Sequence, residues 1–109
     1  MRLLRHADFE RVYQHGRRHF SAHMTVFYLR REGGEGLRVG FTVGRALGGA
    51  VDRNRMKRRL REVVRLQRRS NNFPVDVVIN PKKSALSAEF EDLVKEIGRA
   101  FEVVQQKTR

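Results

Sequence analysis

The sequence predicts an α+β fold with three helices and at least three strands. Two stretches, 56–67 and 90–104, place apolar residues three and four positions apart, the spacing of a helix with one buried side. Two others, 24–29 and 37–43, alternate between two faces as strands do. With 109 residues, the chain is expected to form a single domain over 1–109 with one modest core.

The N-terminal part begins with a short amphipathic helix over 6–15, which Gly16 is expected to end. Phe9 and Tyr13 are four residues apart, so both lie on one side of this helix. The sequence is equally consistent with two interpretations of the pair. The rings are either core anchors or an exposed pair on which unpaired bases stack.

A strand over 19–29 follows, and after the glycine-rich loop 31–36 another strand spans 37–43. The odd-numbered residues of this second strand are apolar and predict a core face. The other face carries Arg38, Gly40 and Thr42. It is small and polar enough to lie beneath the backbone of a ligand.

The C-terminal part contains a short buried strand over 75–79, which Asn80 and Pro81 are expected to stop. The last helix has Ser87 as its predicted N-cap and acidic residues in its first turn. Its apolar positions keep a strict core spacing, which indicates a structural role. They are Phe90, Leu93, Val94, Ile97, Phe101 and Val104.

Positive charge dominates the composition, with 24 Lys and Arg against 12 Asp and Glu, a formal net charge of +12. Such an excess predicts a polyanionic partner whose affinity falls with salt. The absence of cysteine excludes disulfides and thiolate chemistry. No apolar run approaches the roughly 18 residues of a membrane span, and the N-terminus has no signal peptide. We therefore expect a soluble, cytoplasmic protein with no membrane partner and no small-molecule substrate.

Most of the excess charge lies in the stretch 53–69, which holds nine Lys or Arg and one acid, Glu62, for a net charge of +8. On a helix, the apolar side chains of this stretch form one buried arc, and the basic side chains form an adjoining stripe roughly 100° wide. The residues of the buried arc are Met56, Leu60, Val63, Val64 and Gln67.

Like charges stand four residues apart along this helix, at 53/57, 57/61, 61/65 and 65/69. An ordinary solvated helix face, which is the alternative, usually interleaves acids and bases instead. An external anion is therefore expected, and phosphates are favoured because the planar guanidinium group meets two phosphate oxygens at once. The candidate nucleic-acid-binding residues are Arg53, Asn54, Arg55, Lys57, Arg58, Arg61, Arg65 and Arg68.

The loop 44–49 before this helix has the spacing G-x-x-x-x-G of a phosphate-binding loop. Ala50 and Val51 stand where Lys and Ser or Thr would be needed, so nucleoside triphosphate binding is not expected. The free N–H groups of the helix N-terminus, beside Arg45, remain a candidate phosphate site.

Residues for catalysis by the protein itself are scarce. His15, His19 and His23 are four apart, but Gly16 interrupts the helix that would align them, so no metal site is expected. The acids are scattered and do not predict the converging carboxylates of a two-metal nuclease. No Ser/His/Asp ordering stands out either, and no catalytic residue is predicted.

The run 48–62, GGAVDRNRMKRRLRE, closely resembles the signature G-x-A-V-x-R-N-x-x-K-R-x-x-R of the bacterial ribonuclease P protein subunit. Residues 8–17 resemble the first helix of that family, 37–43 its central strand and 75–81 its last strand. Together these matches cover nearly the whole chain in the right order.

This resemblance implies a two-layer sandwich in the order αβββαβα, the ribosomal protein S5 domain 2-like fold. Its four-stranded sheet contains a βαβ crossover of the rarer left hand. The resemblance also implies that the region 19–29 holds two strands, with a break near Ser21 or Ala22.

The resemblance further implies that the chain binds the ribonuclease P RNA and the single-stranded 5′ leader of precursor tRNA. The RNA subunit with bound Mg²⁺ would hydrolyse the phosphodiester, and the protein would need no cofactor. The family usually has two basic residues and a Ser where this chain has Gly44, Arg45 and Ala46. The implied leader cleft comprises Phe9, Tyr13, Phe27, Thr42 and Arg45.

Two other functions compete with this one. A general RNA-binding or ribosome-associated protein would share the charge but would not need an aromatic cleft. A DNA-binding helix-turn-helix protein requires a helix shortly before the basic one, and here a strand and a glycine-rich loop precede it.

Overall fold

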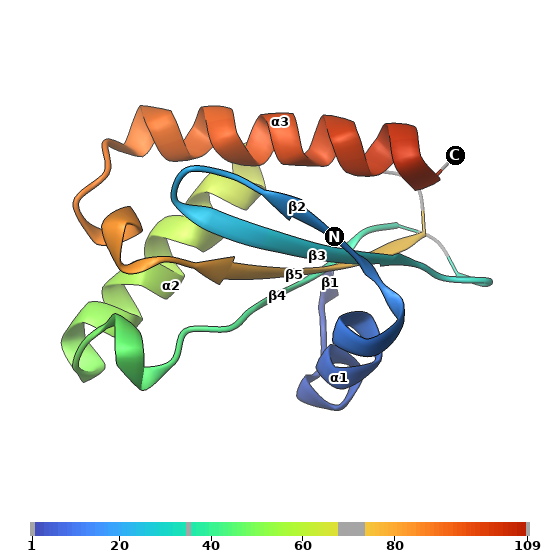
Figure 1. Cartoon of the computed structure of the whole chain (residues 1–109), viewed down its shortest axis with the longest axis horizontal. Helices are drawn as coiled ribbons and strands as arrows, with labels where there is room; N and C mark the ends of the chain where they lie inside the picture. Colours follow the sequence, from blue (N-terminus) through green and yellow to red (C-terminus); the bar gives the residue numbers. More distant parts are fainter. Residues whose placement is uncertain (1, 35, 68–73, 109) are drawn as a thin grey trace.

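The computed structural model (Figure 1) describes residues 2–34, 36–67 and 74–108. The chain forms helices, strands and two short 3-10 turns, η1 and η3. The elements are β1 Arg2–Leu3, α1 His6–His15, β2 Arg17–Phe20, β3 Met24–Arg30, β4 Arg38–Phe41, η1 Arg45–Leu47, α2 Ala50–Leu66, β5 Val75–Pro81, η3 Lys83–Leu86 and α3 Phe90–Thr108.

The strands form one sheet in the order β1-β4-β5-β3-β2. The central strand β5 pairs antiparallel with β3 and parallel with β4, and β2 pairs antiparallel with β3. The predicted order αβββαβα is confirmed from α1 onward, including the break between β2 and β3 at residues 21–23. The two-residue strand β1, parallel to β4, is an additional edge strand.

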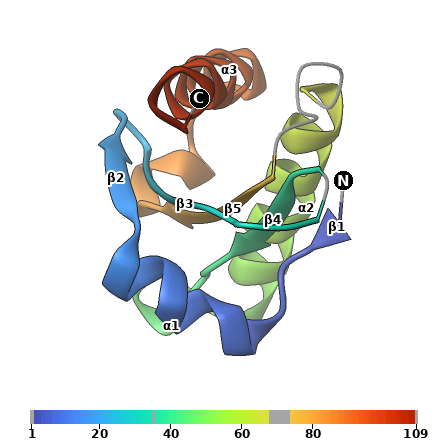
Figure 2. The ribbon, with the colours of Figure 1, turned by 90° about the vertical axis from the view of Figure 1, so that its right-hand side faces the viewer.

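Helix α2 connects the parallel neighbours β4 and β5 and completes a βαβ unit. In Figure 2 both strands run away from the viewer, β5 lies to the left of β4, and α2 lies on the same side of the sheet as α3. The path from β4 through α2 to β5 is therefore left-handed, as predicted and contrary to the usual hand.

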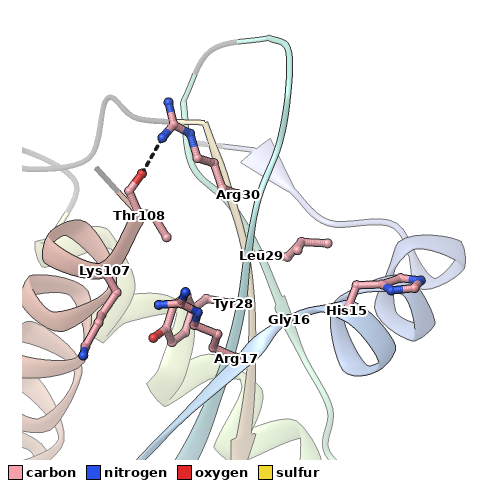
Figure 3. Close-up of a pocket in the computed structure, with 8 residues that line it drawn as sticks. All are labelled: His15, Gly16, Arg17, Tyr28, Leu29, Arg30, Lys107 and Thr108. Atoms are coloured by element: carbon pink, nitrogen blue, oxygen red, sulfur yellow. Dashed lines mark hydrogen bonds between the residues drawn. The ribbon is translucent and has the colours of Figure 1, made fainter.

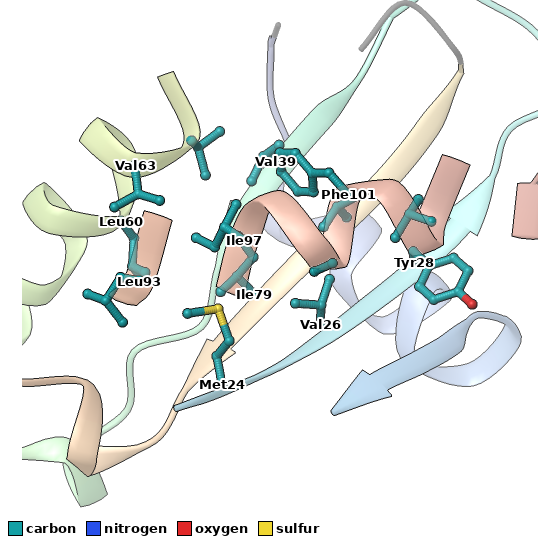
Figure 4. Close-up of a cluster of buried hydrophobic side chains, with 14 of the residues drawn as sticks. Met24, Val26, Tyr28, Val39, Leu60, Val63, Ile79, Leu93, Ile97 and Phe101 are labelled. Atoms are coloured by element: carbon teal, nitrogen blue, oxygen red, sulfur yellow. The ribbon is translucent and has the colours of Figure 1, made fainter. Parts of the chain in front are cut away.

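The main core lies between the sheet and helices α2 and α3, which form the two predicted layers (Figure 4). Its side chains come from the predicted helical stripes and from alternate strand residues, so the predicted core faces are confirmed. A smaller cluster lies on the opposite face of the sheet, where Phe9 and Val12 of α1 pack against Leu4 and Val78. The sheet is thus covered by α2 and α3 on one side and by the shorter α1 on the other.

Gly16 ends α1, as predicted, because the end of this helix closely approaches β3. The Gly16 N–H donates to the Val12 carbonyl oxygen at 2.8 Å. A Cβ atom at position 16 would lie 2.4 Å from that oxygen and 2.5 Å from the carbonyl oxygen of Tyr28. Only glycine allows this contact between α1 and β3.

Two boundaries near the C-terminus differ from the prediction. Ser87 is not the N-cap of the last helix, which begins at Phe90; instead Ser87 closes η3 by donating its N–H to the Ser84 carbonyl oxygen at 3.3 Å. Strand β5 also runs beyond its predicted end to Pro81, because Asn80 and Pro81 stay in register with β3.

Candidate RNA-binding surface

Helix α2 presents its basic residues to solvent because its apolar stripe is fixed in the core. Met56, Leu60 and Val63 are fully buried, so the remaining arcs of the helix point outward. Of the predicted nucleic-acid-binding residues, Arg68 lies outside the described part of the chain. Arg53 and Lys57 are partly buried, and those exposed are Asn54, Arg55, Arg58, Arg61 and Arg65.

Most of these cations lack a counter-charge among the residues that the structure describes. Arg65 is the exception, because its Nη2 lies 2.5 Å from Glu62 Oε1 in an exposed pair three residues apart. Within residues 2–34, 36–67 and 74–108, the other basic members of the predicted set form no ion pair. The outward face of α2 is therefore strongly positive along its length.

Arg59 belongs to the same helix but serves a different purpose. Its guanidinium group donates to the carbonyl oxygens of Ala85, Leu86 and Ala88, at 3.1, 2.9 and 2.5 Å. These bonds tie α2 to η3 and to the segment between η3 and α3. The helical pattern placed Arg59 on an outward arc, and nothing in the sequence indicated its carbonyl partners some 26 to 29 residues away.

The N-terminus of α2 carries an acid of its own. Gly49 caps the helix without a side-chain hydrogen bond, and Asp52 lies in the first turn. The carboxylate of Asp52 faces Gly48, where a Cβ atom would lie 2.8 Å from Asp52 Oδ2. Gly48 also has φ 151°, which favours glycine. The phosphate site predicted at this helix end stays a prediction.

Three of the predicted cleft residues meet on the α1 side of the sheet. The Tyr13 hydroxyl is hydrogen-bonded to Thr42 Oγ1. The Tyr13 ring contacts Phe27 edge to face, with 4.7 Å between centroids. Arg18, which was not predicted, lies over the Phe27 ring at 5.4 Å, a cation–π contact. We call Tyr13, Phe27, Thr42 and Arg18 the aromatic cleft.

Phe9 lies deeper than the other cleft residues, with 8% of its surface exposed. Its ring covers Gly40 so closely that a Cβ atom there would lie 2.4 Å from Phe9 Cε1. The strand pattern had suggested that the face around Gly40 lies open beneath a ligand. This part of the prediction is wrong, because Phe9 fills the space above Gly40. Of the two interpretations of the pair, Phe9 fits a core anchor, and Tyr13 keeps part of its ring exposed.

Arg45 stands at the start of η1, three residues after Thr42, and is exposed. A depression of about 370 Å³ opens beside it between η1 and the end of β5, and Thr42 and Asn80 contribute to its wall. Lys82 and Lys83 also line it, and sequence reasoning missed both. The sequence feature that could have indicated them is a pair of adjacent lysines directly after a strand.

Comparison with known proteins identifies the family, because the family model described as Ribonuclease P matches residues 1–105. The chain belongs to this family. The ribonuclease P protein component of Oleidesulfovibrio alaskensis is 46% identical over 83 residues, 75% of this chain and 66% of that protein. The one from Symbiobacterium thermophilum is 39% identical over 101 residues, 93% of this chain and 88% of that protein. A solved structure of the Staphylococcus aureus RNase P protein superposes with a TM-score of 0.81 at 22% identity, over 94% of both chains.

Membership in the ribonuclease P family confirms the resemblance carried by the run 48–62 and the assignment to tRNA processing within a ribonucleoprotein. The structural match confirms the predicted fold. The general RNA-binding alternative gains no support from these relatives. A helix-turn-helix arrangement does not fit either, since β4 and η1 precede α2.

In this ribonuclease P family member, three further arginines are held by a buried acid that sequence reasoning missed. Asp76 on β5 is fully buried. Arg38 donates to both of its carboxylate oxygens, each at 2.7 Å. Arg31 donates to Oδ1 at 2.7 Å and Arg11 to Oδ2 at 2.8 Å. We call these four residues the Asp76 cluster, and it joins α1, β4, β5 and the residue that follows β3.

Burial by itself raises the pKa of the Asp76 carboxyl, but the hydrogen bonds from Arg38 and Arg31 outweigh burial and hold this pKa below its ordinary value. The hydrogen bond to Asp76 likewise raises the pKa of Arg38. The sequence feature that could have indicated this cluster is an acid inside an otherwise apolar strand, since a buried carboxylate needs cationic partners. Which arginines would supply them was not readable from spacing.

Two further classes of site are absent from the described residues. No group of three or more His, Asp or Glu side chains among them is arranged to hold a metal ion. None of their helices combines the length and apolar composition that crossing a membrane requires.

Proposed function

We propose that the chain is the protein subunit of a ribonuclease P ribonucleoprotein. In this proposal α2 binds the catalytic RNA, and the aromatic cleft binds the single-stranded 5′ leader of precursor tRNA. The observation that carries the proposal is the outward face of α2, whose cations largely lack counter-charges within the described chain. RNA phosphates would supply the missing negative charge and release bound counterions.

The length of α2 suits a phosphate backbone. From Asn54 to Arg65 the helix rises about 16 Å at 1.5 Å per residue, a length over which a nucleic-acid duplex carries roughly ten phosphates. Several side chains can therefore each meet a phosphate at the same time. We assign RNA contact to Arg53, Asn54, Arg55, Lys57, Arg58, Arg61, Arg65 and Arg68.

The aromatic cleft suits single-stranded RNA because exposed rings stack on any base, each stack contributing about 1–3 kcal/mol. We assign base stacking to Tyr13 and Phe27, and phosphate or sugar contact to Thr42 and Arg45. Phe9 supports the cleft from beneath by packing on Gly40. The hydrogen bond between Tyr13 and Thr42 sets the position of the tyrosine ring before any ligand binds.

We infer that the RNA subunit with Mg²⁺ hydrolyses the phosphodiester and that the protein, acting in the cytoplasm, is accessory. Many acids of the described chain already make structural contacts, which supports this division of labour. Asp76 is held by three arginines, and Glu96 accepts the backbone N–H of His23 at 2.8 Å. The cations of α2 would replace part of the ionic atmosphere of the RNA, so less Mg²⁺ is needed.

Reconstitution tests the proposal. The protein is added to a bacterial ribonuclease P RNA, and cleavage of precursor tRNA at its mature 5′ end is measured against Mg²⁺ concentration. Saturating protein is expected to lower the Mg²⁺ midpoint, and Arg58→Gln with Arg61→Gln should restore much of the original requirement. The matched control is Lys95→Gln with Arg99→Gln, which removes the same charge from α3. An unchanged midpoint, or cleavage by the polypeptide without RNA, overturns the proposal.

The leader assignment has its own test, the ratio of affinities for precursor and mature tRNA. Tyr13→Ala with Phe27→Ala should bring this ratio close to one, because only the precursor carries the leader. If the double variant still prefers the precursor as strongly as the unchanged chain does, the cleft does not bind the leader.

A further inference from the structure

A pocket at the start of β2 gathers positive charge that the proposed function does not use (Figure 3). Its volume is about 270 Å³, and it lies where the ends of α1, β3 and α3 meet the start of β2. None of its residues belongs to α2 or to the aromatic cleft. The pocket is lined by His15, Gly16, Arg17, Tyr28, Leu29, Arg30, Lys107 and Thr108.

Strand β2 contributes a side chain to this pocket and another to the aromatic cleft. Adjacent residues of a strand point to opposite faces of the sheet. Arg18 lies over Phe27 on the cleft side, whereas Arg17 is paired across the strands with Tyr28 and lines the pocket. One short edge strand therefore supplies an arginine to each of two sites.

The positive charge of the pocket is larger than the negative partial charge of the two helix ends beside it. Arg17, Arg30 and Lys107 bring three positive charges, and the eight lining residues include no carboxylate. The C-terminal ends of α1 and α3 each carry roughly half a negative charge, about one in total. Arg30 Nη1 donates to the Thr108 carbonyl oxygen at 2.9 Å and accounts for part of this compensation. About two positive charges remain for a ligand.

Tyr28 adds an observation independent of the charge. Only 4% of its surface is exposed, and none of the hydrogen bonds among the described residues involves its hydroxyl. Figure 3 shows its ring extending toward Arg17 and Lys107. Buried hydroxyl groups are usually paired, and an unpaired one is costly, so an acceptor oxygen from a ligand is expected here.

We propose that this pocket binds a phosphate group, with Arg17, Arg30 and Lys107 as its cations and the Tyr28 hydroxyl as a hydrogen-bond donor. The pocket has several times the volume of one water molecule, about 30 Å³, and thus has room for such a group. The phosphate belongs either to an RNA backbone or to a free inorganic anion. The site does not rest on the proposed function, because it uses neither α2 nor the cleft.

Nuclear magnetic resonance of the full chain, labelled with ¹⁵N, tests the proposal. The amide signals of Gly16, Arg17 and Leu29 are followed as inorganic phosphate replaces chloride at constant ionic strength. A saturable shift of these three amide signals is expected, and Tyr28→Phe should weaken the phosphate binding that they report about tenfold, because it removes a donor to a charged group. Arg17→Gln with Lys107→Gln should weaken it at least as much.

The control variant Lys95→Gln with Arg99→Gln, which has the same net charge, should bind phosphate within twofold of the unchanged chain. The proposal is overturned if phosphate shifts none of the pocket amides. It is also overturned if a folded Tyr28→Phe variant, verified by its thermal unfolding, binds phosphate as tightly as the unchanged chain.

A second measurement separates the two sources of phosphate. A short single-stranded RNA is added to the phosphate-saturated protein, and the bound phosphate is followed by its ³¹P signal. Displacement of phosphate together with shifts of the pocket amides assigns the site to an RNA backbone. Retention of phosphate assigns it to a free anion.

Discussion

The arginines of the Asp76 cluster have a carboxylate partner inside the protein, whereas those on the outward face of α2 largely have none in the described chain. Arg11, Arg31 and Arg38 surround one buried carboxylate that neutralises part of their charge and joins four segments of the fold. Arg58 and Arg61 on α2 have no ion pair in the described chain. The number of arginines therefore overstates the RNA-binding surface, and the presence of an internal counter-charge separates the two groups.

The largest effect is expected at the buried acid. Asp76→Asn removes the negative charge and leaves three arginines facing each other, so the free energy of unfolding should fall by about 4 kcal/mol. Urea denaturation measures this loss. Asp92→Asn on the exposed first turn of α3 is the control, with an expected loss below about 1 kcal/mol. A loss of similar size in the two variants would mean that the cluster does not hold the fold together.

Substituting the outward arginines should lower RNA affinity and leave the free energy of unfolding nearly unchanged. Arg58→Gln with Arg61→Gln is expected to lower affinity for ribonuclease P RNA about thirtyfold, roughly 2 kcal/mol, at near-physiological salt. The dependence of log K on log salt should become shallower by about 1.5 to 2, while the free energy of unfolding stays within about 0.5 kcal/mol. Filter binding over a range of salt measures both quantities. An unchanged salt dependence would show that these two residues do not meet phosphates.

Arg59 sharpens the comparison because it shares its helix with the outward arginines. Arg59→Gln removes hydrogen bonds to the carbonyl oxygens of Ala85, Leu86 and Ala88, so we expect a loss of about 1.5 kcal/mol in unfolding free energy. Its RNA affinity should stay within twofold of the unchanged chain. If the variant instead loses RNA binding and keeps its stability, Arg59 binds RNA, and its hydrogen bonds within the protein do not exclude it from the RNA-binding surface.

The smallest effect concerns pH. The folded-state pKa of Asp76 is depressed, so its contribution to stability is complete above the ordinary value of 3.8 and is lost as pH falls through the lower folded value. The slope from this one group is at most about 1.4 kcal/mol per pH unit. Unfolding measured between pH 6 and about pH 3 should show the difference between the unchanged chain and Asp76→Asn shrinking by roughly 1 kcal/mol. A difference that is constant with pH would contradict the depressed pKa.

The sequence predicted those parts of the fold that repeat locally. The stripe from Met56 to Val64 and the core face of α3 follow from a period of 3.6 residues, and both are buried as predicted. The exposure of most of the basic face follows from the same period. Membership of the family was also predictable, since the run 48–62 is continuous in the chain.

The parts that the sequence did not predict depend on contacts between distant segments. Arg38 and Asp76 are 38 residues apart and meet only because β4 and β5 are neighbours in the sheet. Arg18 lies over Phe27 only because β2 folds back on β3. Ser87 has a side chain suited to an N-cap, but in the structure it ends the turn η3, where its N–H donates to the Ser84 carbonyl oxygen. Residue type indicated what each side chain can do, and topology determined which partner it found.

The position of β5 has a consequence for how the chain folds during synthesis. This strand lies between β4 and β3, yet it is the last of the strands to be made. A nascent chain that ends before residue 75 therefore has two sheet halves with nothing to join them. Formation of the native sheet has to wait until most of the chain has left the ribosome, so the cationic helix is complete before the scaffold that will hold it.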